Sequence, residues 1–206
     1  MGLGRPAPPG KGAQTRQAIL DAAIDRFGRD GFRSTSVADI ARDAGVGGTV
    51  TYAYFPNKEA LFLAALDEDA AGVIQEGVLV TLDAPTPTSW SESLMTTLVG
   101  AVDGHPLARR VLAGLEPHVT DRMLEIPALN ELRKAVAERL RADQLAGEVR
   151  ADIDPVAIAN GTVAICLSLL MSVLQFGTDG VSVYGRDVLA VFEAAIDRTP
   201  PERPAR

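Results

Sequence analysis

A tight glycine turn between two short helical patterns, within residues 35–58, constrains the fold of this chain most strongly. Ser36 suits the cap of the first helix, because its hydroxyl can accept a hydrogen bond from a free backbone N–H group. Gly45 stands where that helix should end in a left-handed residue, and Pro56 ends the second helix. The apolar residues of the first pattern recur on one helix face: Val37, Ile40, Ala41 and Ala44. Two short helices joined in this way form a helix-turn-helix, which lays its second helix in the major groove of DNA.

By spacing alone, an ordinary helical hairpin inside an all-α core explains this stretch equally well. The surrounding residues favour the helix-turn-helix, because they resemble the DNA-binding domain of TetR-type transcriptional regulators. The resemblance runs without gaps through roughly residues 15–66 and rests on Ile19 to Ala23, Phe27, Gly31, Phe32, Thr35 to Val37, Ile40, Ala41, Ala44 to Val46, Tyr52, Tyr54, Phe55 and Asn57 to Phe62. It implies a DNA-binding regulator with a helical effector-binding and dimerisation domain behind the helix-turn-helix.

The second helix of the pair departs from the family pattern. Gly47 stands where relatives usually carry Ser, and glycine supplies no side-chain acceptor for a cap. Gly48 replaces a variable and often polar residue, and Thr49 stands where a small residue is frequent. Thr51 stands where an apolar residue usually faces the core, and we expect its hydroxyl to bond to a carbonyl one turn earlier.

The resemblance also implies a set of DNA contacts. Tyr52 and Lys58 match family positions that contact phosphates, as do Thr35 and Ser36 at the start of the helix pair. Thr49 and Ala53 are candidates for contact with thymine methyl groups, and Tyr54 for another base edge. Few long polar side chains are present, so phosphate contact and DNA shape should carry much of the affinity. The complete set of candidates is Thr35, Ser36, Gly47, Gly48, Thr49, Thr51, Tyr52, Ala53, Tyr54 and Lys58.

The net charge alone argues against a nucleic-acid partner, because the 206-residue chain has 20 basic and 27 acidic side chains, a net charge of −7. The distribution of charge reverses that argument. Residues 1–58 contain eight basic and five acidic side chains, whereas the remainder contains 12 basic and 22 acidic ones. A basic N-terminal part joined to an acidic remainder suits a phosphate-binding domain attached to something else.

The rest of the sequence predicts helices separated by glycine and proline breaks, and no convincing strand. We therefore predict an all-α fold of about nine helices, in which the fourth, near residues 57–80, is the lever between two domains. The predicted organisation is a disordered arm at 1–14, a helix-turn-helix domain at 15–60, an effector-binding and dimerisation domain at 61–198, and a disordered tail at 199–206.

The helix at 156–176 is apolar nearly all round, so it must be buried on several sides. We expect it to form a homodimer interface together with the last helix, at 184–197, as the resemblance also implies. Its most apolar run, 163–174, is shorter than the 20 or so residues that span a bilayer. With no signal-peptide pattern, the sequence predicts a soluble, cytoplasmic protein with no membrane partner. Cys166 lies alone in this run and is expected to be a buried small hydrophobe.

The sequence carries no pattern typical of catalysis or of metal binding: no HExxH, no CxxC, no phosphate-binding glycine loop and no nucleophile elbow. We therefore expect no cofactor and no enzymatic activity. His105 is interpreted as the polar end of a helix.

The middle helices, roughly residues 61–174, are expected to enclose a mostly apolar pocket for a small hydrophobic effector. Binding of the effector should release the protein, acting as a repressor, from a palindromic operator. For any single lining residue, simple core packing is the better explanation. The candidates are Trp90, Leu94, Met95, Leu98, Leu112, Met123, Leu167, Met171 and Phe176, with His105, His118, Arg122 and Asn130 as polar anchors. The alternative function is a DNA-bound regulator that has no effector and is controlled by a partner protein; an enzyme is a remote third.

Overall fold

The computed structural model describes residues 10–82, 97–119 and 125–177, together with 187, 188, 190, 191 and 193–196 of a last helix. Within these ranges every regular element is a helix, which confirms the predicted fold class. In chain order they are α1 (Lys11–Ser34), α2 (Val37–Asp43), α3 (Gly48–Tyr54), α4 (Lys58–Leu82), α6 (Pro106–Leu112), the 3-10 turn η1 (Pro117–Val119), α8 (Pro127–Ala146) and α9 (Pro155–Phe176).

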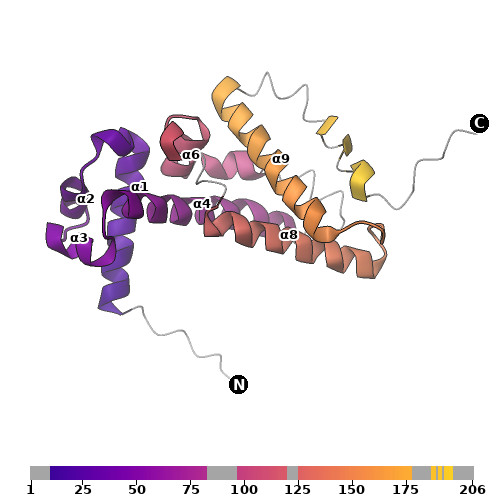
Figure 1. The fold of residues 1–206 in the computed structure, drawn as a ribbon, viewed down its shortest axis with the longest axis horizontal. Coiled ribbons are helices and arrows are strands. Elements are labelled where there is room, and N and C mark those ends of the chain that lie inside the picture. The colour runs from indigo at the N-terminus through magenta and orange to yellow at the C-terminus, as the bar shows by residue number, and fades with distance from the viewer. Residues whose placement is uncertain are drawn as a thin grey trace, which may run out of the picture.

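Helices α1, α2 and α3 form one end of an elongated molecule, here called the head (Figure 1). Helix α4 runs out of the head, and with α6, η1, α8 and α9 it forms the body (Figure 1). One continuous core joins the two parts, because α4 packs on α1 at one end and on α8 and α6 at the other.

Helix α1 packs across α2 and α3 through an apolar stripe that is completely buried: Ile19, Leu20, Ala23 and Phe27. The helix begins at Lys11, inside the segment that the sequence assigned to an arm, and Thr15 does not cap it. Instead the Thr15 hydroxyl donates to the Lys11 carbonyl at 3.0 Å, within the first turn. Gly31 breaks the helical backbone, with φ 81° and ψ 166°, and the chain then resumes one further turn to Ser34.

The helix-turn-helix forms where the local signals place it. The Ser36 hydroxyl accepts from the Asp39 N–H at 3.1 Å and so caps α2. Gly45 takes the left-handed conformation with φ 67°, and α3 ends before Pro56. Gly47 caps α3 without any side-chain hydrogen bond, as its lack of a side chain requires.

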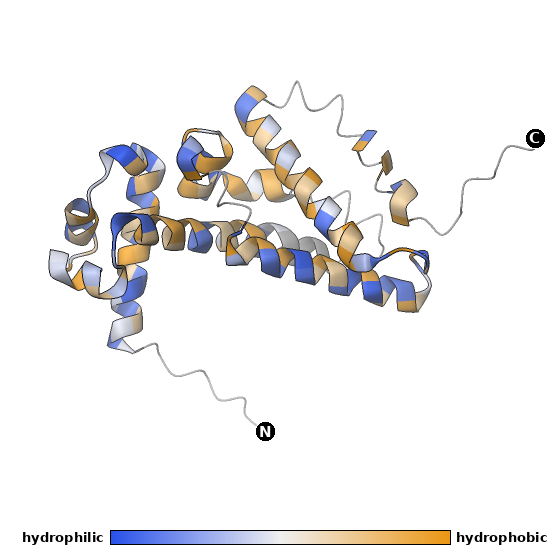
Figure 2. Cartoon of the chain, viewed as in Figure 1, coloured by the Kyte–Doolittle hydropathy of each residue, from blue (hydrophilic) through white to orange (hydrophobic). Residues whose placement is uncertain are grey.

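Helix α9 is bounded by local signals at both ends. Asp154 accepts from the Val156 N–H at 2.9 Å, Pro155 fills the first helical position, and Gly177 ends the helix with φ 84°. Figure 2 shows α9 apolar along most of its length, whereas α8 carries many hydrophilic residues. Leu98 and Val102, in the helical residues 97–102 before α6, are buried too. Trp90 lies outside the described residues.

Among the described residues, α9 is the one helix long and apolar enough to cross a membrane, judged by length and composition. It has 22 residues and a mean hydropathy of 2.0 in its most apolar window, so the prediction that its apolar run is too short was wrong. Thr162, Ser168 and Ser172 interrupt the apolar character of the helix little, because each hydroxyl donates to the carbonyl four residues earlier. The core helix of a soluble protein passes the same test, and α9 packs on α8 and α6.

Two aspartates of α4 cap the body helices that pack against it. Asp67 accepts the Ala128 N–H at 3.0 Å, at the start of α8. Asp69 accepts the N–H groups of Leu107 and Ala108 at 2.9 and 2.8 Å, at the start of α6. Neither α6 nor α8 has a side-chain cap of its own, since His105 and Ile126 at their N-cap positions make no such bond. The first N–H groups of a helix have no partner within it, so α4 supplies them.

Replacing Asp69 with alanine should lower the free energy of unfolding by about 3 kcal/mol, because it leaves buried amides at the start of α6 without an acceptor. Urea unfolding followed by circular dichroism measures this. Asp103→Ala is the matched control, since Asp103 is an exposed carboxylate near the same helix start and should cost little. Equal stabilities of the two variants would show that Asp69 does not hold α6.

Candidate nucleic-acid interface and apolar cavity

The solvent face of α3 carries no charged side chain. Exposed on it are glycines, a threonine, an alanine and two larger residues, Val50 and Tyr52, which are 38% and 55% exposed. Tyr54 is half-buried, and its hydroxyl lies against Gly12 in the first turn of α1. Val50 was not among the sequence candidates, because a valine at helical spacing is normally assigned to the core. Its exposure makes it part of the face that α3 offers to DNA.

Two of the predicted DNA contacts must be corrected, because their side chains are buried. Thr35 is 3% exposed, and its hydroxyl donates to the Gly31 carbonyl at 2.8 Å, which ties the end of α1 to the start of α2. Thr51 is fully buried on the inner face of α3. Its hydroxyl has no hydrogen-bond partner, so the expected bond to a carbonyl one turn earlier is not formed. Ser36, in contrast, is exposed, while its hydroxyl caps α2 by accepting from the Asp39 N–H.

The orphaned hydroxyl predicts that Thr51→Val stabilises the protein by about 1 kcal/mol, because valine keeps the branched shape and removes a buried polar atom without a partner. Thermal unfolding measures the change. Thr35→Val is the control, since it breaks a hydrogen bond that is made and should destabilise. A Thr51→Val protein no more stable than the wild type would mean that the hydroxyl finds a partner in solution.

Several arginines of the head are engaged in ion pairs and contribute less to DNA attraction than the charge count implied. Arg26 in α1 donates to both oxygens of Asp43 at 2.5 and 3.1 Å, and Arg42 pairs with Asp39. The hydrogen bond from Arg26 lowers the pKa of Asp43, and the hydrogen bonds from Ser36 and Arg42 lower that of Asp39. The Arg26–Asp43 pair connects α1 to α2, whereas the Arg42–Asp39 pair lies within α2, and both keep the carboxylates ionised. Arg29 is paired in the same way with Asp30.

The remaining basic residues of the head, and Lys58 at the start of α4, pair with no carboxylate within the described part of the chain. The head residues are Lys11, Arg16 and Arg33. The Arg16 guanidinium lies 5.4 Å from the centre of the Phe55 ring. The Lys58 ammonium lies 4.4 Å from that of the Phe32 ring, so Lys58 is half-buried at the start of α4. Lys11 stands in the first turn of α1, next to the residue that contacts Tyr54, and is therefore close to α3.

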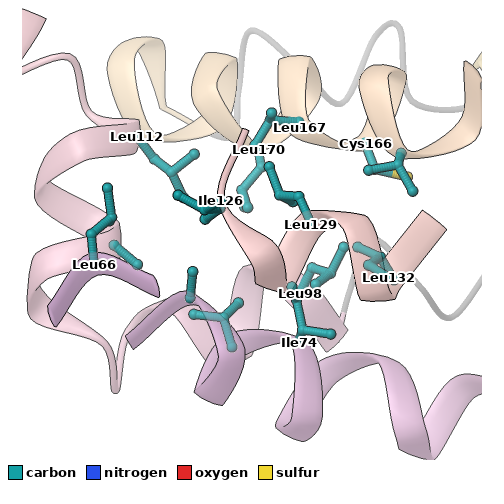
Figure 3. Close-up of a pocket in the computed structure, with 14 residues that line it drawn as sticks. Leu66, Ile74, Leu98, Leu112, Ile126, Leu129, Leu132, Cys166, Leu167 and Leu170 are labelled. Carbon is teal, nitrogen blue, oxygen red and sulfur yellow. The ribbon is translucent and has the colours of Figure 1, made fainter. Parts of the chain in front are cut away.

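A cavity of about 60 Å³ lies in the body between α4, α6, α8 and α9 (Figure 3). Its walls are aliphatic apart from one thiol: Leu66, Ala70, Val73, Ile74, Leu98, Ala108, Leu112, Ile126, Leu129, Leu132, Val163, Cys166, Leu167 and Leu170. Sites for drug-sized ligands measure about 300–1,000 Å³. Helices must therefore separate, or side chains rotate, before a molecule of that size enters. Burial raises the pKa of the Cys166 thiol to about 12, in keeping with the predicted small hydrophobe.

The structure brings only some of the predicted ligand residues to this cavity. Leu98, Leu112 and Leu167 line it, while Met171 is half-buried on α9 but is not one of the lining residues. Phe176 was predicted wrongly: it is 77% exposed at the end of α9, although the neighbouring Gln175 still donates to the Leu112 carbonyl of α6. Trp90, Leu94, Met95 and Met123 lie outside the described residues. The α4 wall was not predicted from the sequence, although Leu66, Ala70, Val73 and Ile74 recur on one helix face.

The polar anchors proposed from the sequence also lie elsewhere. His105 is directed to Asp69, with its Nδ1 atom 2.8 Å from Oδ1, and it stands at the N-cap of α6. His118 lies against Phe32, and Asn130 is exposed on α8. Arg122 is outside the described residues. The described wall of the cavity is therefore apolar throughout.

Comparison with known proteins identifies the class of this helix-turn-helix protein. Residues 19–65 match the family described as bacterial regulatory proteins, tetR family. The regulator RutR of Escherichia coli is 49% identical over 51 residues, which is 25% of this chain and 24% of that protein. The match to RutR thus spans about a quarter of its length. The transcriptional repressor KstR2 of Rhodococcus jostii is 31% identical over 145 residues, covering 68% of this chain and 70% of that protein. This chain belongs to the TetR family.

Solved structures agree with the fold. The regulator FadR of Bacillus subtilis, in complex with stearoyl-CoA, superposes with a TM-score of 0.65 at 18% identity, over 87% of this chain and 98% of that one. At that identity the likeness concerns the fold alone. The relatives are transcriptional regulators and not enzymes, in agreement with the sequence prediction.

Proposed function

We propose that this chain is a cytoplasmic transcriptional repressor that binds a palindromic operator as a homodimer and leaves it when a small apolar effector enters the body. One observation carries the proposal: α4 begins in the DNA-binding head and forms one wall of the apolar cavity. A change at the cavity therefore acts on the element that positions the head. Regulators of this family bind DNA and dimerise.

The proposed DNA interface is the exposed face of α3 together with the first turn of α1 and Lys58 at the start of α4. Thr49, Val50 and Ala53 offer methyl groups, which suit the methyl group of thymine in the major groove. Tyr52 offers a hydroxyl, and Lys11 a charge, to backbone phosphates. Since α3 has no arginine, lysine, asparagine or glutamine, bidentate base contacts from this helix are excluded, and shape and phosphate contact carry more of the affinity.

The proposed dimer interface is the side of α9 that faces away from α8. Only 28% of the apolar window of α9 is buried within one chain, which leaves more apolar surface than a monomer commonly exposes. Small exposed residues on that side permit close approach of a second helix: Ala157, Gly161, Ala164 and Ser168. A second copy of the chain, packed through α9 and the last helix, covers this surface.

The effector proposed for the cavity is a molecule with an aliphatic portion. Aliphatic walls without a described polar group favour hydrocarbon over charged or strongly hydrogen-bonding ligands, because a buried polar group without a partner costs free energy. A ligand with a polar group must place that group outside these walls. FadR of Bacillus subtilis, whose fold is similar, was crystallised with stearoyl-CoA, which has such a divided character.

Operator binding can be tested with DNA selected from a random library. Wild-type protein should select palindromic sites, and log K should fall linearly with log salt concentration. Lys58→Ala should weaken binding to all sequences and reduce the slope by about one unit. Lys134→Ala is the control, because Lys134 is an exposed lysine of α8 far from the head. An unchanged slope for Lys58→Ala removes Lys58 from the interface, and failure of the wild type to select any DNA rejects the repressor.

The effector can be tested with straight-chain fatty acids and their CoA esters. At least one should lower operator affinity in the wild type, and Ala70→Leu, which fills the cavity from α4, should abolish the response while retaining operator binding. Ala142→Leu on the exposed side of α8 is the control and should respond normally. If no compound of a broad apolar series shifts the wild-type complex, the regulator controlled by a partner protein becomes the better explanation.

A further inference from the structure

The head touches the body at a second place besides α4, where the end of α1 meets α6 and η1. Gly28 permits the approach, because a Cβ atom there would come within 2.7 Å of Pro106 at the start of α6. An aromatic cluster fills the junction, with ring centres 4.9 to 6.3 Å apart: Phe27 and Phe32 from α1, Phe62 from α4 and His118 from η1. The head therefore has a non-covalent contact with the body in addition to the continuous helix.

The break in α1 gives this junction a specific polar contact. Gly31 has φ 81°, so the backbone leaves the helix and the N–H of Phe32 points out of it. That N–H donates to Oε1 of Glu116 at 3.1 Å, across 84 residues of sequence. A Cβ atom on Gly31 would lie 2.7 Å from the same oxygen and 2.5 Å from Nη2 of Arg110. The carboxylate thus occupies the space that only glycine leaves at the break.

Glu116 is held in place from the body side. Its side chain is 5% exposed, and Nε of Arg110 donates to Oε1 at 2.7 Å. Nδ1 of His118 lies 3.7 Å from the second oxygen, Oε2. A buried carboxylate is costly unless it is paired, so the bond from Arg110 fixes where Glu116 can sit. Arg110 belongs to α6, the same helix whose Ala108 and Leu112 line the cavity.

We infer that Glu116 is a positioning residue for operator binding: it fixes the orientation of the head on the body, and with it the separation of the two α3 helices in a dimer. The inference rests on the proposed function for its link to DNA. Displacement of α6 by a ligand is passed through Arg110 and Glu116 to the N–H of Phe32, in parallel with α4. Coupling by this route requires that the head take two orientations on the body, which the distance measurement below tests directly.

The first experiment measures head orientation without DNA. A spin label on Ala38→Cys, exposed on α2, reports the distance between the two heads of the dimer. Cys166 is buried with a raised pKa and should not be labelled. Wild-type protein should give a narrow distance distribution, and Glu116→Ala a clearly broader one. Asp103→Asn is the control, an exposed carboxylate near α6 that does not touch the head, and should match the wild type.

The second experiment links orientation to DNA. The two half-sites of the selected operator are moved apart or together in steps of one base pair, and DNA with a single half-site is tested alongside. Glu116→Ala should lose about threefold or more of the wild-type preference for one spacing, while its affinity for the single half-site is nearly unchanged. A purely structural role would lower both affinities together and would not change the spacing preference.

Each result decides for or against the inference. The inference is overturned if folded Glu116→Ala keeps the wild-type distance distribution and the wild-type spacing preference. It is also overturned if the variant loses affinity equally for the single half-site and for the palindrome. If that variant does not fold, Glu116→Gln replaces it, since the amide keeps an acceptor for Phe32 but loses the charge that holds Arg110. Glu116→Gln should then show part of the broadening, and a wild-type distribution rejects the inference. Failure of the wild type to bind any operator rejects the proposed function, while the distance measurement still decides the role of Glu116.

Discussion

The arrangement of the body depends on one buried carboxylate, Asp69. It is 4% exposed and accepts from two backbone N–H groups at the start of α6 while lying 2.8 Å from the ring of His105. Because α6 begins without a cap of its own, Asp69 makes α4 and α6 one unit at that end. The cavity opens between these helices and their neighbours, and the head touches α6 both at its start, where Gly28 meets Pro106, and beyond its end, where Phe32 meets Glu116. The contact of Asp69 with the start of α6 thus affects both the position of the head and the shape of the cavity.

The elements that the sequence predicted well are those specified by neighbouring residues. The cap at Ser36 and the break at Gly45 act over a few residues, so spacing is enough to place them. Asp69 could not be found that way, because its partners come 38 and 39 residues later and it stands beside the acidic residues Asp67 and Glu68, from which spacing does not distinguish it. The burial of Phe176 was predicted wrongly for a related reason: apolar character predicts burial, but which side of a helix end faces its neighbours is a property of the packing.

The candidate DNA site shows the same division. Sequence spacing located α3, but it could not tell the buried Thr51 from the exposed Val50, since that depends on the rotation of a seven-residue helix against α1 and α2. Charge was overestimated for a similar reason. Arg26 and Asp43 are 17 residues apart, and only the docking of α1 against α2 brings them together and removes that arginine from the surface available to phosphates.

Glycines at the crossings of the main helices have a consequence for redesign. Gly28 lies against Pro106, Gly31 against Glu116 and Arg110, and Gly72 against the ring of His105, each without room for a further carbon atom. Substitutions at these positions cannot adjust a spacing by small steps, because even alanine forces a backbone or a buried side chain to move. The walls of the cavity are different, because replacing a leucine or isoleucine there with valine changes the side chain by one carbon only. An engineer seeking a sensor for a new compound therefore has a graded variable in the walls and a fixed frame in the glycines.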